Sequence, residues 1–346
     1  MQAAVLEKCN SDLKLYELEI PELKEGQVLV EIAYSGLCRS QLMEIKGGRG
    51  EDKYLPHLLG HEACGIVRSI GSNVSKVKPG DWVILTWIKS SGLDDYSCQY
   101  KCGDKAINSG AVTTLNEFTV VSENRCILKP ESLNPDVAIL FGCALPTGMG
   151  MVFNEIKPEP SSTVAVFGLG GIGMASLVAL TILNGINIIA VDTNPYKLEL
   201  AEKLGCQNLI DASKDDVITE IKDLTNGKGV DYAIEASGSK KVIEQAFLSV
   251  RDGGVECIFA SHPPNGQKIE LEPHDLIRGK SIRGSWGGAC NPDVDVPHFV
   301  ELCAKHNVPL EMLLSAPYSL SEINQAIKDL EEGKTLRSLI KINSDL

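Results

Sequence analysis

The sequence lacks an excess of basic residues. Lys and Arg number 33 against 46 Asp and Glu, which gives a formal net charge of −13 over 346 residues. Proteins that bind nucleic acids or anionic membranes through general electrostatics present a basic surface. The composition therefore argues against a nucleic-acid partner and against a membrane partner.

The first ten residues lack the apolar run of a secretory signal, and they carry Glu7 and Lys8. The eleven cysteines are odd in number and scattered along a long chain. Disulfide frameworks are typical of short secreted domains with even cysteine counts. We therefore expect reduced thiols and a cytoplasmic location.

The chain also has few long stretches without charge, and the longest candidate is Thr163–Val191. Its length would span a bilayer. Five glycines interrupt it, however, and Asp192 follows directly. We interpret it as a strand, a turn, a helix and a strand within a folded domain.

Local patterns predict two domains of different character. The first part is β-rich, because short alternating or apolar runs are bounded by glycine and proline turns. Its predicted strands cover Gln27–Ile32, Gly65–Ile70, Trp82–Trp87 and Phe118–Val121.

From about Leu145 strands alternate with helices, which predicts a doubly wound parallel sheet. The predicted strands cover Thr163–Phe167, Ile186–Val191, Val230–Ala236 and Val255–Ala260. The predicted helices cover Gly171–Leu183, Lys197–Leu204, Pro297–Lys305 and Leu320–Glu332, and a last short strand lies near Leu339–Ile340.

The sharpest local motif is Gly168-Leu-Gly-Gly-Ile-Gly173, between a predicted strand and a predicted helix. Such glycines permit a tight turn, let the backbone approach a pyrophosphate and pack the helix on the strand. Asp192 ends the next strand, 19 residues after Gly173, where a carboxylate can hold ribose hydroxyls. Together these features predict a dinucleotide site, with a glycine-rich packing turn as the alternative. Its predicted residues are Gly168, Gly170, Gly171, Ile172, Gly173 and Asp192.

Asp192 also predicts which dinucleotide binds. A carboxylate repels the 2′-phosphate of NADP, and neither Thr193 nor Asn194 supplies a positive charge, so NAD is favoured. Lys197, in the following helix, is a candidate for the adenosine ribose, and a solvated helix charge is the alternative.

Cys38, His61 and Cys143 offer the mixed sulfur and nitrogen donors of a catalytic zinc with one open position. Taken alone, the residue types do not establish a metal site, because free cysteines are commonly buried in cores.

Longer motifs identify the family. They occur in order along the chain, and they are Gly60-His-Glu-Ala-Cys-Gly-Ile-Val67, Val77-Lys-Pro-Gly-Asp-Trp-Val83, Gly142-Cys-Ala-Leu-Pro-Thr-Gly148, the glycine turn and Leu336-Arg-Ser-Leu-Ile-Lys341. With them the chain resembles the zinc-dependent alcohol dehydrogenases of the medium-chain dehydrogenase/reductase superfamily, from about Val28 to Ile342. The resemblance implies an α/β protein with a GroES-like β-rich catalytic domain (1–145 and 286–346) and a Rossmann domain (146–285).

The resemblance also implies roles for single residues. Cys38, His61 and Cys143 would hold one catalytic zinc, with the carboxylate of Glu62 nearby and the hydroxyl of Ser40 taking the substrate proton. For the cofactor, it implies that Arg39 and Arg337 clamp the pyrophosphate and that Thr147 packs against the nicotinamide. Trp87 falls at the wall of the alcohol pocket, and an ordinary core tryptophan is the alternative.

Four departures from the family pattern stand out. A structural zinc lobe needs four close cysteines, and here only Cys98 and Cys102 are present, so we expect no second zinc. Met43 stands where a histidine often passes the proton to solvent. Gln41 stands where an aspartate usually orients the zinc-bound imidazole. His262 replaces an apolar residue, and we consider it as a relay base or a ligand of a polar substrate; a surface loop histidine is the alternative.

These inferences predict a zinc-dependent, NAD-linked alcohol dehydrogenase. The polar segment between Lys89 and Thr113, with Met43 and His262, favours a polar secondary alcohol, a polyol or a sugar, and primary alcohols stay open. By resemblance we expect a homodimer or homotetramer. Two alternatives are a zinc-free, NADPH-dependent quinone or enone reductase of the same superfamily and a non-catalytic NAD-binding protein.

Overall fold

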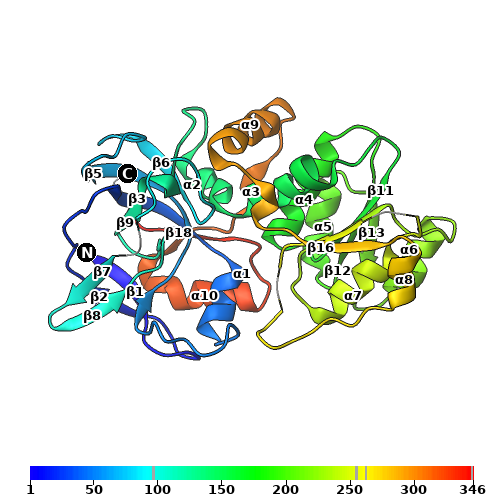
Figure 1. Ribbon diagram of the computed structural model, residues 1–346, viewed down its shortest axis with the longest axis horizontal. Coiled ribbons are helices and arrows are strands. Elements are labelled where there is room, and N and C mark those ends of the chain that lie inside the picture. Colours follow the sequence, from blue (N-terminus) through cyan, green and yellow to red (C-terminus); the bar gives the residue numbers. More distant parts are fainter. Residues whose placement is uncertain (96–97, 254–255, 262, 344–345) are drawn as a thin grey trace. The chain divides into compact units, whose positions relative to one another are not determined.

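The structure is a computed structural model that describes residues 1–95, 98–253, 256–261, 263–343 and 346. Most of its helices and strands are labelled in Figure 1. The chain divides into two compact units. Unit 1 comprises Met1–Cys143, Asn291–Val300 and Leu310–Leu346, and unit 2 comprises Ala144–Cys290 and Glu301–Pro309.

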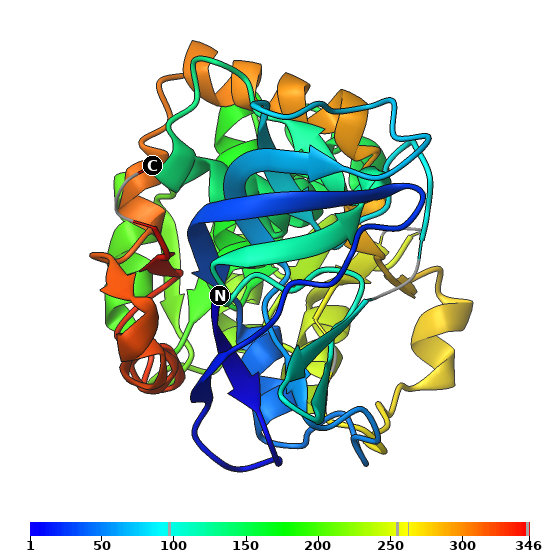
Figure 2. The same cartoon turned by 90° about the vertical axis from the view of Figure 1, so that its left-hand side faces the viewer.

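Unit 1 is β-rich, and most of its strand pairs are antiparallel. One sheet has the strand order β2-β1-β4-β8-β7, and the other has the order β10-β6-β5-β3-β18-β17 with β9 paired to β3. Figure 2 shows strands of this unit, most of them in blue to cyan. The strands are β1 (Gln2–Leu6), β2 (Lys14–Glu17), β3 (Gln27–Leu37), β4 (His57–Leu58), β5 (Glu62–Ile70), β6 (Trp82–Thr86), β7 (Gln99–Cys102), β8 (Lys105–Asn108), β9 (Phe118–Ser122), β10 (Cys126–Leu128), β17 (Tyr318–Ser319) and β18 (Ser338–Lys341).

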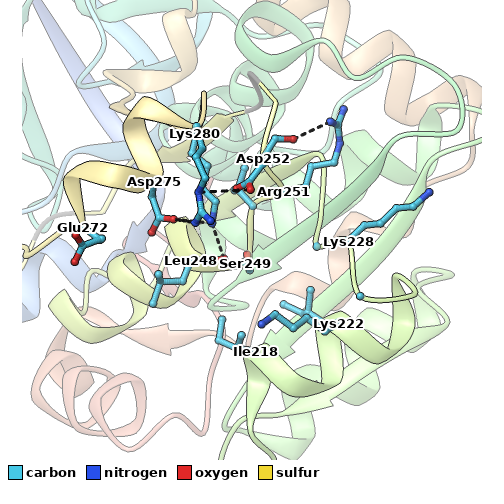
Figure 3. Close-up of a pocket in the computed structure, with 15 residues that line it drawn as sticks. Ile218, Lys222, Lys228, Leu248, Ser249, Arg251, Asp252, Glu272, Asp275 and Lys280 are labelled. Atoms are coloured by element: carbon cyan, nitrogen blue, oxygen red, sulfur yellow. Dashed lines mark hydrogen bonds and ion pairs between the residues drawn. The ribbon is translucent and has the colours of Figure 1, made fainter.

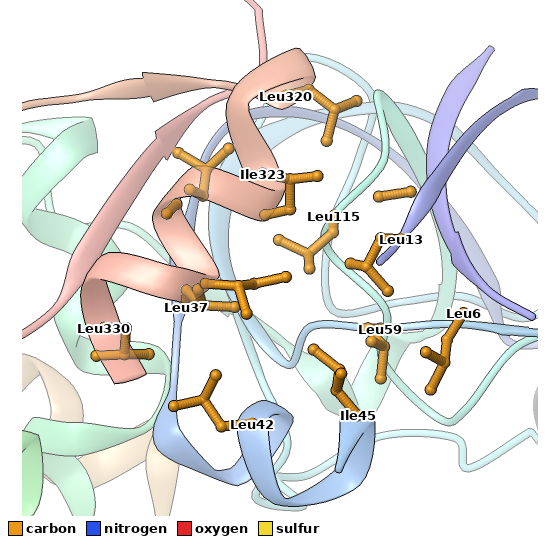
Figure 4. Packing of buried hydrophobic residues seen from close by; sticks show 14 residues of the cluster. Leu6, Leu13, Leu37, Leu42, Ile45, Leu59, Leu115, Leu320, Ile323 and Leu330 are labelled. Carbon is orange, nitrogen blue, oxygen red and sulfur yellow. The ribbon is translucent and has the colours of Figure 1, made fainter. Parts of the chain in front are cut away.

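Two helices of unit 1 share an apolar core. Leu42 and Ile45 of α1 (Arg39–Ile45) are buried in one cluster with Ile323 and Leu330 of α10 (Ile323–Glu331) (Figure 4). This packing holds α1, which begins directly after Cys38. The other helical segments that begin in this unit are η1 (Glu123–Arg125), α2 (Pro135–Ala138), η2 (Ile139–Gly142), α9 (Pro292–Lys305), η5 (Leu310–Leu313) and η6 (Leu320–Glu322).

Unit 2 is a parallel six-stranded sheet in the order β13-β12-β11-β14-β15-β16. Its strands are β11 (Thr163–Phe167), β12 (Asn187–Asp192), β13 (Asn208–Asp211), β14 (Tyr232–Glu235), β15 (Glu256–Phe259) and β16 (Ser281–Gly284). Its helical segments are α3 (Ala144–Gly150), η3 (Met151–Ile156), α4 (Gly171–Ile182), α5 (Pro195–Lys203), α6 (Val217–Leu224), α7 (Lys240–Ser249), α8 (Pro273–Ile277) and η4 (Gly287–Ala289).

Helices cover both faces of this sheet. Ala165 and Phe167 of β11 share a buried cluster with Ile221 of α6 and Phe247 of α7. Val166 points to the opposite face, as alternation along a strand requires, where Gly173 of α4 approaches it. The sheet is therefore doubly wound, and the expected α/β class, with a β-rich part and a parallel doubly wound part, is confirmed.

One predicted element begins earlier than expected. The proline at 297 was expected to open a helix, but α9 begins at Pro292 and runs through Pro297. Pro292 also fits a first-turn position, where its missing N–H costs nothing, and Asp293 and Asp295 favour the helix N-terminus. The aspartates were the better signal for the start of this helix.

Among the described residues, no single helix has the length and apolar character to cross a membrane. One bent pair, Pro135–Gly142 with Ala144–Ile156, meets that requirement by length and composition only.

The segment from Lys89 to Asp95, where a structural zinc lobe would begin, is held by carboxylates. Glu123 is buried and accepts hydrogen bonds from the backbone N–H groups of Ser75, Lys76 and Leu93 at 2.8–3.0 Å. Asp293 accepts from the backbone and the hydroxyl of Ser91. Burial alone would raise the pKa of Glu123. The three backbone hydrogen bonds that its carboxylate accepts hold this pKa below its usual value.

We expect Glu123→Gln to destabilise the protein by about 1–3 kcal/mol at pH 7, because an amide offers one acceptor where three donors converge. The pKa of Glu123 is lowered in the folded state, so its stabilisation is present above the unfolded pKa and is lost as the pH falls through the folded value. Urea unfolding at pH 7 and at pH 4 checks this. A difference between wild type and variant that is equally large at both values would contradict it.

Candidate functional site

Antiparallel pairing brings Cys38 and His61 together although 22 residues separate them. Strands β3 and β5 pair with Ser35 opposite Ala63. Continued by two residues, this register sets position 37 opposite position 61, so Cys38 and His61 meet at the same end of the two strands. The residues of each strand supply the apolar core that fixes the register.

Cys143 joins them through a close approach of the chain before it. A Cβ atom on Gly142 would lie 2.5 Å from the Leu85 carbonyl oxygen and 2.8 Å from the Glu62 Cβ. Only glycine leaves room for this contact, which sets Cys143 beside β5. The imidazole Nε2 of His61 lies 3.2 Å from the Cys143 sulfur.

The donor atoms of Cys38, His61 and Cys143 all lie within 4.8 Å of one another. Two thiolates and one imidazole are donors that Zn²⁺ prefers, and three protein ligands with a fourth position open are typical of catalytic zinc. The residues present therefore fit a zinc ion.

The two thiols titrate as a pair. The pKa of Cys38 is held well below its ordinary value because Cys143 donates to its sulfur and the Arg337 guanidinium lies nearby. The pKa of Cys143 is raised well above its ordinary value by Cys38 and by burial. A bound dication would favour the thiolate form of both.

Gln41 links two of the three metal-ligand candidates. Its amide oxygen accepts the backbone N–H of Cys38 at 2.8 Å, and its amide nitrogen faces Nδ1 of His61. An aspartate at this position would accept a hydrogen bond from the imidazole. The nitrogen faces the ring instead, because the oxygen is already used at the start of α1.

Glu62 is fully buried beside the cysteine pair. Its Oε1 lies 3.2 Å from the Arg337 guanidinium, and both side chains are at most 3% exposed. Burial raises the pKa of Glu62, and the positive charge of Arg337 opposes that rise. Gly36 makes room for the carboxylate, since a Cβ there would lie 2.1 Å from Oε1.

The glycine turn of unit 2 has one open and two packed glycines. Gly168 has a positive φ of 84°, and a Cβ on Gly173 would lie 2.0 Å from the Gly168 carbonyl oxygen. Among the described residues, a Cβ on Gly170 would meet no atom within 4 Å. The open glycine is the second of the motif, where a pyrophosphate approaches the backbone, so the turn fits a dinucleotide.

Asp192 holds this turn from the side of β12. Its Oδ2 accepts the Leu169 backbone N–H at 2.6 Å, and its Oδ1 accepts the Asn194 N–H at 2.9 Å. The ammonium of Lys197 lies 3.7 Å from Oδ2. Lys197 is therefore paired with the carboxylate that was expected to hold the ribose.

Two family models match the chain: "Alcohol dehydrogenase GroES-like domain" over residues 24–131 and "Zinc-binding dehydrogenase" over residues 171–305. The S-(hydroxymethyl)glutathione dehydrogenase of Escherichia coli O6:H1 is 31% identical to it, over 98% of this chain and 99% of that protein. The chain belongs to the zinc-dependent alcohol dehydrogenases. It is thus a member of the medium-chain dehydrogenase/reductase superfamily and an oxidoreductase that acts on CH–OH donors.

Solved structures of this enzyme family agree with the fold. The benzyl alcohol dehydrogenase of Acinetobacter calcoaceticus is 27% identical, with a TM-score of 0.88 over 99% of both chains. An alcohol dehydrogenase zinc-binding domain protein of Burkholderia ambifaria is also 27% identical, with a TM-score of 0.88 over 99% of this chain and 98% of that one.

The other expected site residues of this alcohol dehydrogenase differ in burial and in hydrogen bonding. Ser40 Oγ, Thr147 Oγ1 and Arg337 Nε are buried without a hydrogen bond to any described residue. Arg39, the first residue of α1, is exposed. Strand register sets Thr86 opposite Glu62, so Trp87 follows beside His61. The histidine at position 262 lies outside the described residues.

Unit 2 contains a cavity of about 830 Å³, and Figure 3 shows residues that line it. Its lining includes Gly229, shortly before β14, and Lys280, directly before β16. The glycine turn instead follows the carboxyl end of β11. Because the strands are parallel, the cavity lies at their amino ends and the turn at their carboxyl ends. The cavity is therefore separate from the dinucleotide turn.

Sequence reasoning did not single out Glu235, at the carboxyl end of β14. It is fully buried, and it lies beside β11 through a pairing between residues 68 positions apart, with Phe167 opposite it. The only local signal was an acidic residue that ends an apolar strand, three residues before Gly238.

Proposed function

We propose that this alcohol dehydrogenase uses one zinc ion and NAD to oxidise a polar alcohol, or to reduce the corresponding carbonyl compound. The observation that carries the proposal is the convergence of the Cys38, His61 and Cys143 donor atoms within 4.8 Å. The same convergence argues against the alternative of a zinc-free quinone or enone reductase, because such an enzyme requires no metal ligands.

The chain's own residues have distinct tasks in this proposal. Zinc bound at the cysteine pair supplies Lewis acidity, and bound NAD supplies the hydride acceptor. The Ser40 hydroxyl takes the substrate proton, which its unpaired, buried Oγ supports. Glu62 and Arg337 form a buried ion pair, so that neither charge is left without a partner. Arg39 and Arg337 bind the pyrophosphate, and Thr147 holds the nicotinamide.

The cofactor preference is testable at Asp192. We expect wild-type kcat/KM to favour NAD over NADP, because the carboxylate repels a 2′-phosphate. Asp192→Ser should lower the ratio of kcat/KM for NAD to kcat/KM for NADP by about tenfold or more. It would remove about 1.4 kcal/mol of repulsion between the carboxylate and the 2′-phosphate. Initial rates with both cofactors check this, and Asp211→Ser, at the end of the adjacent β13, is the control. A ratio that Asp192→Ser leaves unchanged would contradict the prediction.

The polar substrate rests on the polar segment that follows Trp87 and on one relative. Between Lys89 and Asp95 the chain carries Ser90, Ser91 and Asp94, and one relative is named for S-(hydroxymethyl)glutathione, a polar compound. A panel of polyols, sugars, aliphatic alcohols and aromatic alcohols with NAD tests it. A kcat/KM that rises with chain length of simple aliphatic alcohols would overturn the polar preference.

We further propose one zinc per chain, a homodimer or homotetramer, and a cytoplasmic location. Cys98 and Cys102 supply two of the four thiols that a structural site needs. The cytoplasmic location is supported by the odd number and scattered positions of the eleven cysteines, which are unlike a disulfide framework. Elemental analysis and light scattering test the first two proposals, and two zinc ions per chain would refute the absence of a structural site.

A further inference from the structure

Glu235 forms a compact clamp at the end of β14. Its Oε1 accepts three hydrogen bonds, from the backbone N–H groups of Ser237 at 2.7 Å and Gly238 at 3.0 Å and from the Ser237 hydroxyl. Its Oε2 is buried without a hydrogen bond to any described residue. The carboxylate thus fixes the chain from 235 to 238 in one conformation.

This clamp bears directly on the dinucleotide turn. Glu235 lies opposite Phe167, the last residue of β11, and the Ala236 N–H donates to the Phe167 carbonyl at 2.8 Å. A Cβ on Gly168 would lie 2.7 Å from the Ser237 nitrogen and 2.9 Å from its Cα. Ser237 therefore forms the wall against which the first glycine of the turn is packed.

The turn is consequently held on both flanks by strand-end carboxylates. On one side Asp192 of β12 accepts the Leu169 N–H. On the other side Glu235 of β14 fixes Ser237 against Gly168. Asp192 is the residue expected to hold the ribose, whereas Glu235 is fully buried.

We propose that Glu235 is a positioning residue of the dinucleotide site, which sets the shape of the Gly168–Gly173 turn through Ser237. The inference rests on the proposed use of NAD. Burial without a cationic partner is costly for a carboxylate, and it raises the pKa of Glu235 to about 7. The three hydrogen bonds that Glu235 accepts offset part of the free-energy cost of its burial, and they fix the position of Ser237.

The test is NADH affinity, measured by fluorescence titration of the zinc-loaded protein. Glu235→Leu leaves three donors without an acceptor and frees Ser237 to move, so NADH Kd should rise at least about tenfold. Glu235→Gln keeps one acceptor oxygen at the same distance and should bind within about threefold of wild type. At saturating NAD, kcat of Glu235→Leu should remain close to wild type while KM for NAD rises.

The control is Asp231→Leu, which removes a carboxylate at the opposite end of the same strand, where it accepts the Thr163 N–H and pairs with Arg251. It should lower the melting temperature and leave NADH Kd unchanged. If Glu235→Leu is insoluble, Glu235→Asp decides, because it withdraws the acceptor and keeps the charge. We expect at least a threefold rise in its Kd.

Wild-type affinity in Glu235→Leu or Glu235→Asp would overturn the inference, as would a loss of affinity no larger than in Asp231→Leu. Failure of the wild-type protein to bind NADH would refute the proposed cofactor, and the inference with it. The two failures are therefore distinguishable in one set of titrations.

Discussion

Cys38→Ala should contain almost no zinc and should oxidise alcohols at least about 1,000-fold more slowly than wild type. Zinc contributes several kcal/mol of charge stabilisation in such reactions, and each 1.36 kcal/mol is a factor of ten in rate. Cys38 directly precedes α1, and its sulfur lies within 4.8 Å of the donor atoms of both other ligands. Among the described residues no further thiol belongs to this group. Elemental analysis and kcat/KM on the same preparation check the prediction.

Cys102→Ala is the matched control, because Cys102 lies at the end of β7 in a region where a structural zinc would be bound. It should retain both zinc and activity. Loss of zinc in Cys102→Ala, or full zinc content in Cys38→Ala, would show that the metal is held elsewhere.

Arg337→Met should destabilise the protein by about 3–5 kcal/mol, the cost of leaving one member of a buried ion pair without its partner. Glu62 is fully buried, and its pKa, already raised by burial, would rise further without the guanidinium. At low pH Glu62 becomes protonated and neutral in the variant, which reduces the free-energy cost of burying it without a partner. The loss should therefore be larger at pH 8 than at pH 5. Urea denaturation curves at both pH values measure it.

Two variants give this prediction its controls. The double variant Glu62→Gln with Arg337→Met removes both charges and should recover more than half of the lost stability. Arg68→Met breaks the ion pair with Glu31, in which Arg68 is 43% exposed, and should cost less than about 1 kcal/mol. Equal losses in Arg337→Met and Arg68→Met would contradict the role assigned to burial.

Elements with a strong local pattern were predictable from the sequence. The strand Thr163–Phe167 has the predicted bounds, and α4 begins at the predicted Gly171. Both follow from short-range causes, an apolar run and glycines that permit a tight turn. The start of α9 was misplaced, because two prolines in one helix gave conflicting local signals.

The site depended on pairing that no local pattern contains. Cys38 and His61 meet through the register of β3 and β5, and Cys143 meets them through the space left by Gly142. Residue types and spacing alone favoured buried thiols over a metal site, and it was the family resemblance that joined the three. Glu235 was missed for the same reason, since its importance comes from a neighbouring strand.

The orientation of the Gln41 amide has a consequence for the start of α1. An imidazole that binds metal through Nε2 carries its proton on Nδ1, and that N–H then seeks an acceptor. The oxygen of Gln41 is the acceptor for the Cys38 N–H as well. Two donors thus compete for one oxygen, so metal occupancy and fraying of the helix are thermodynamically coupled. Hydrogen exchange at the Cys38 amide would then differ between metal-loaded and metal-depleted protein.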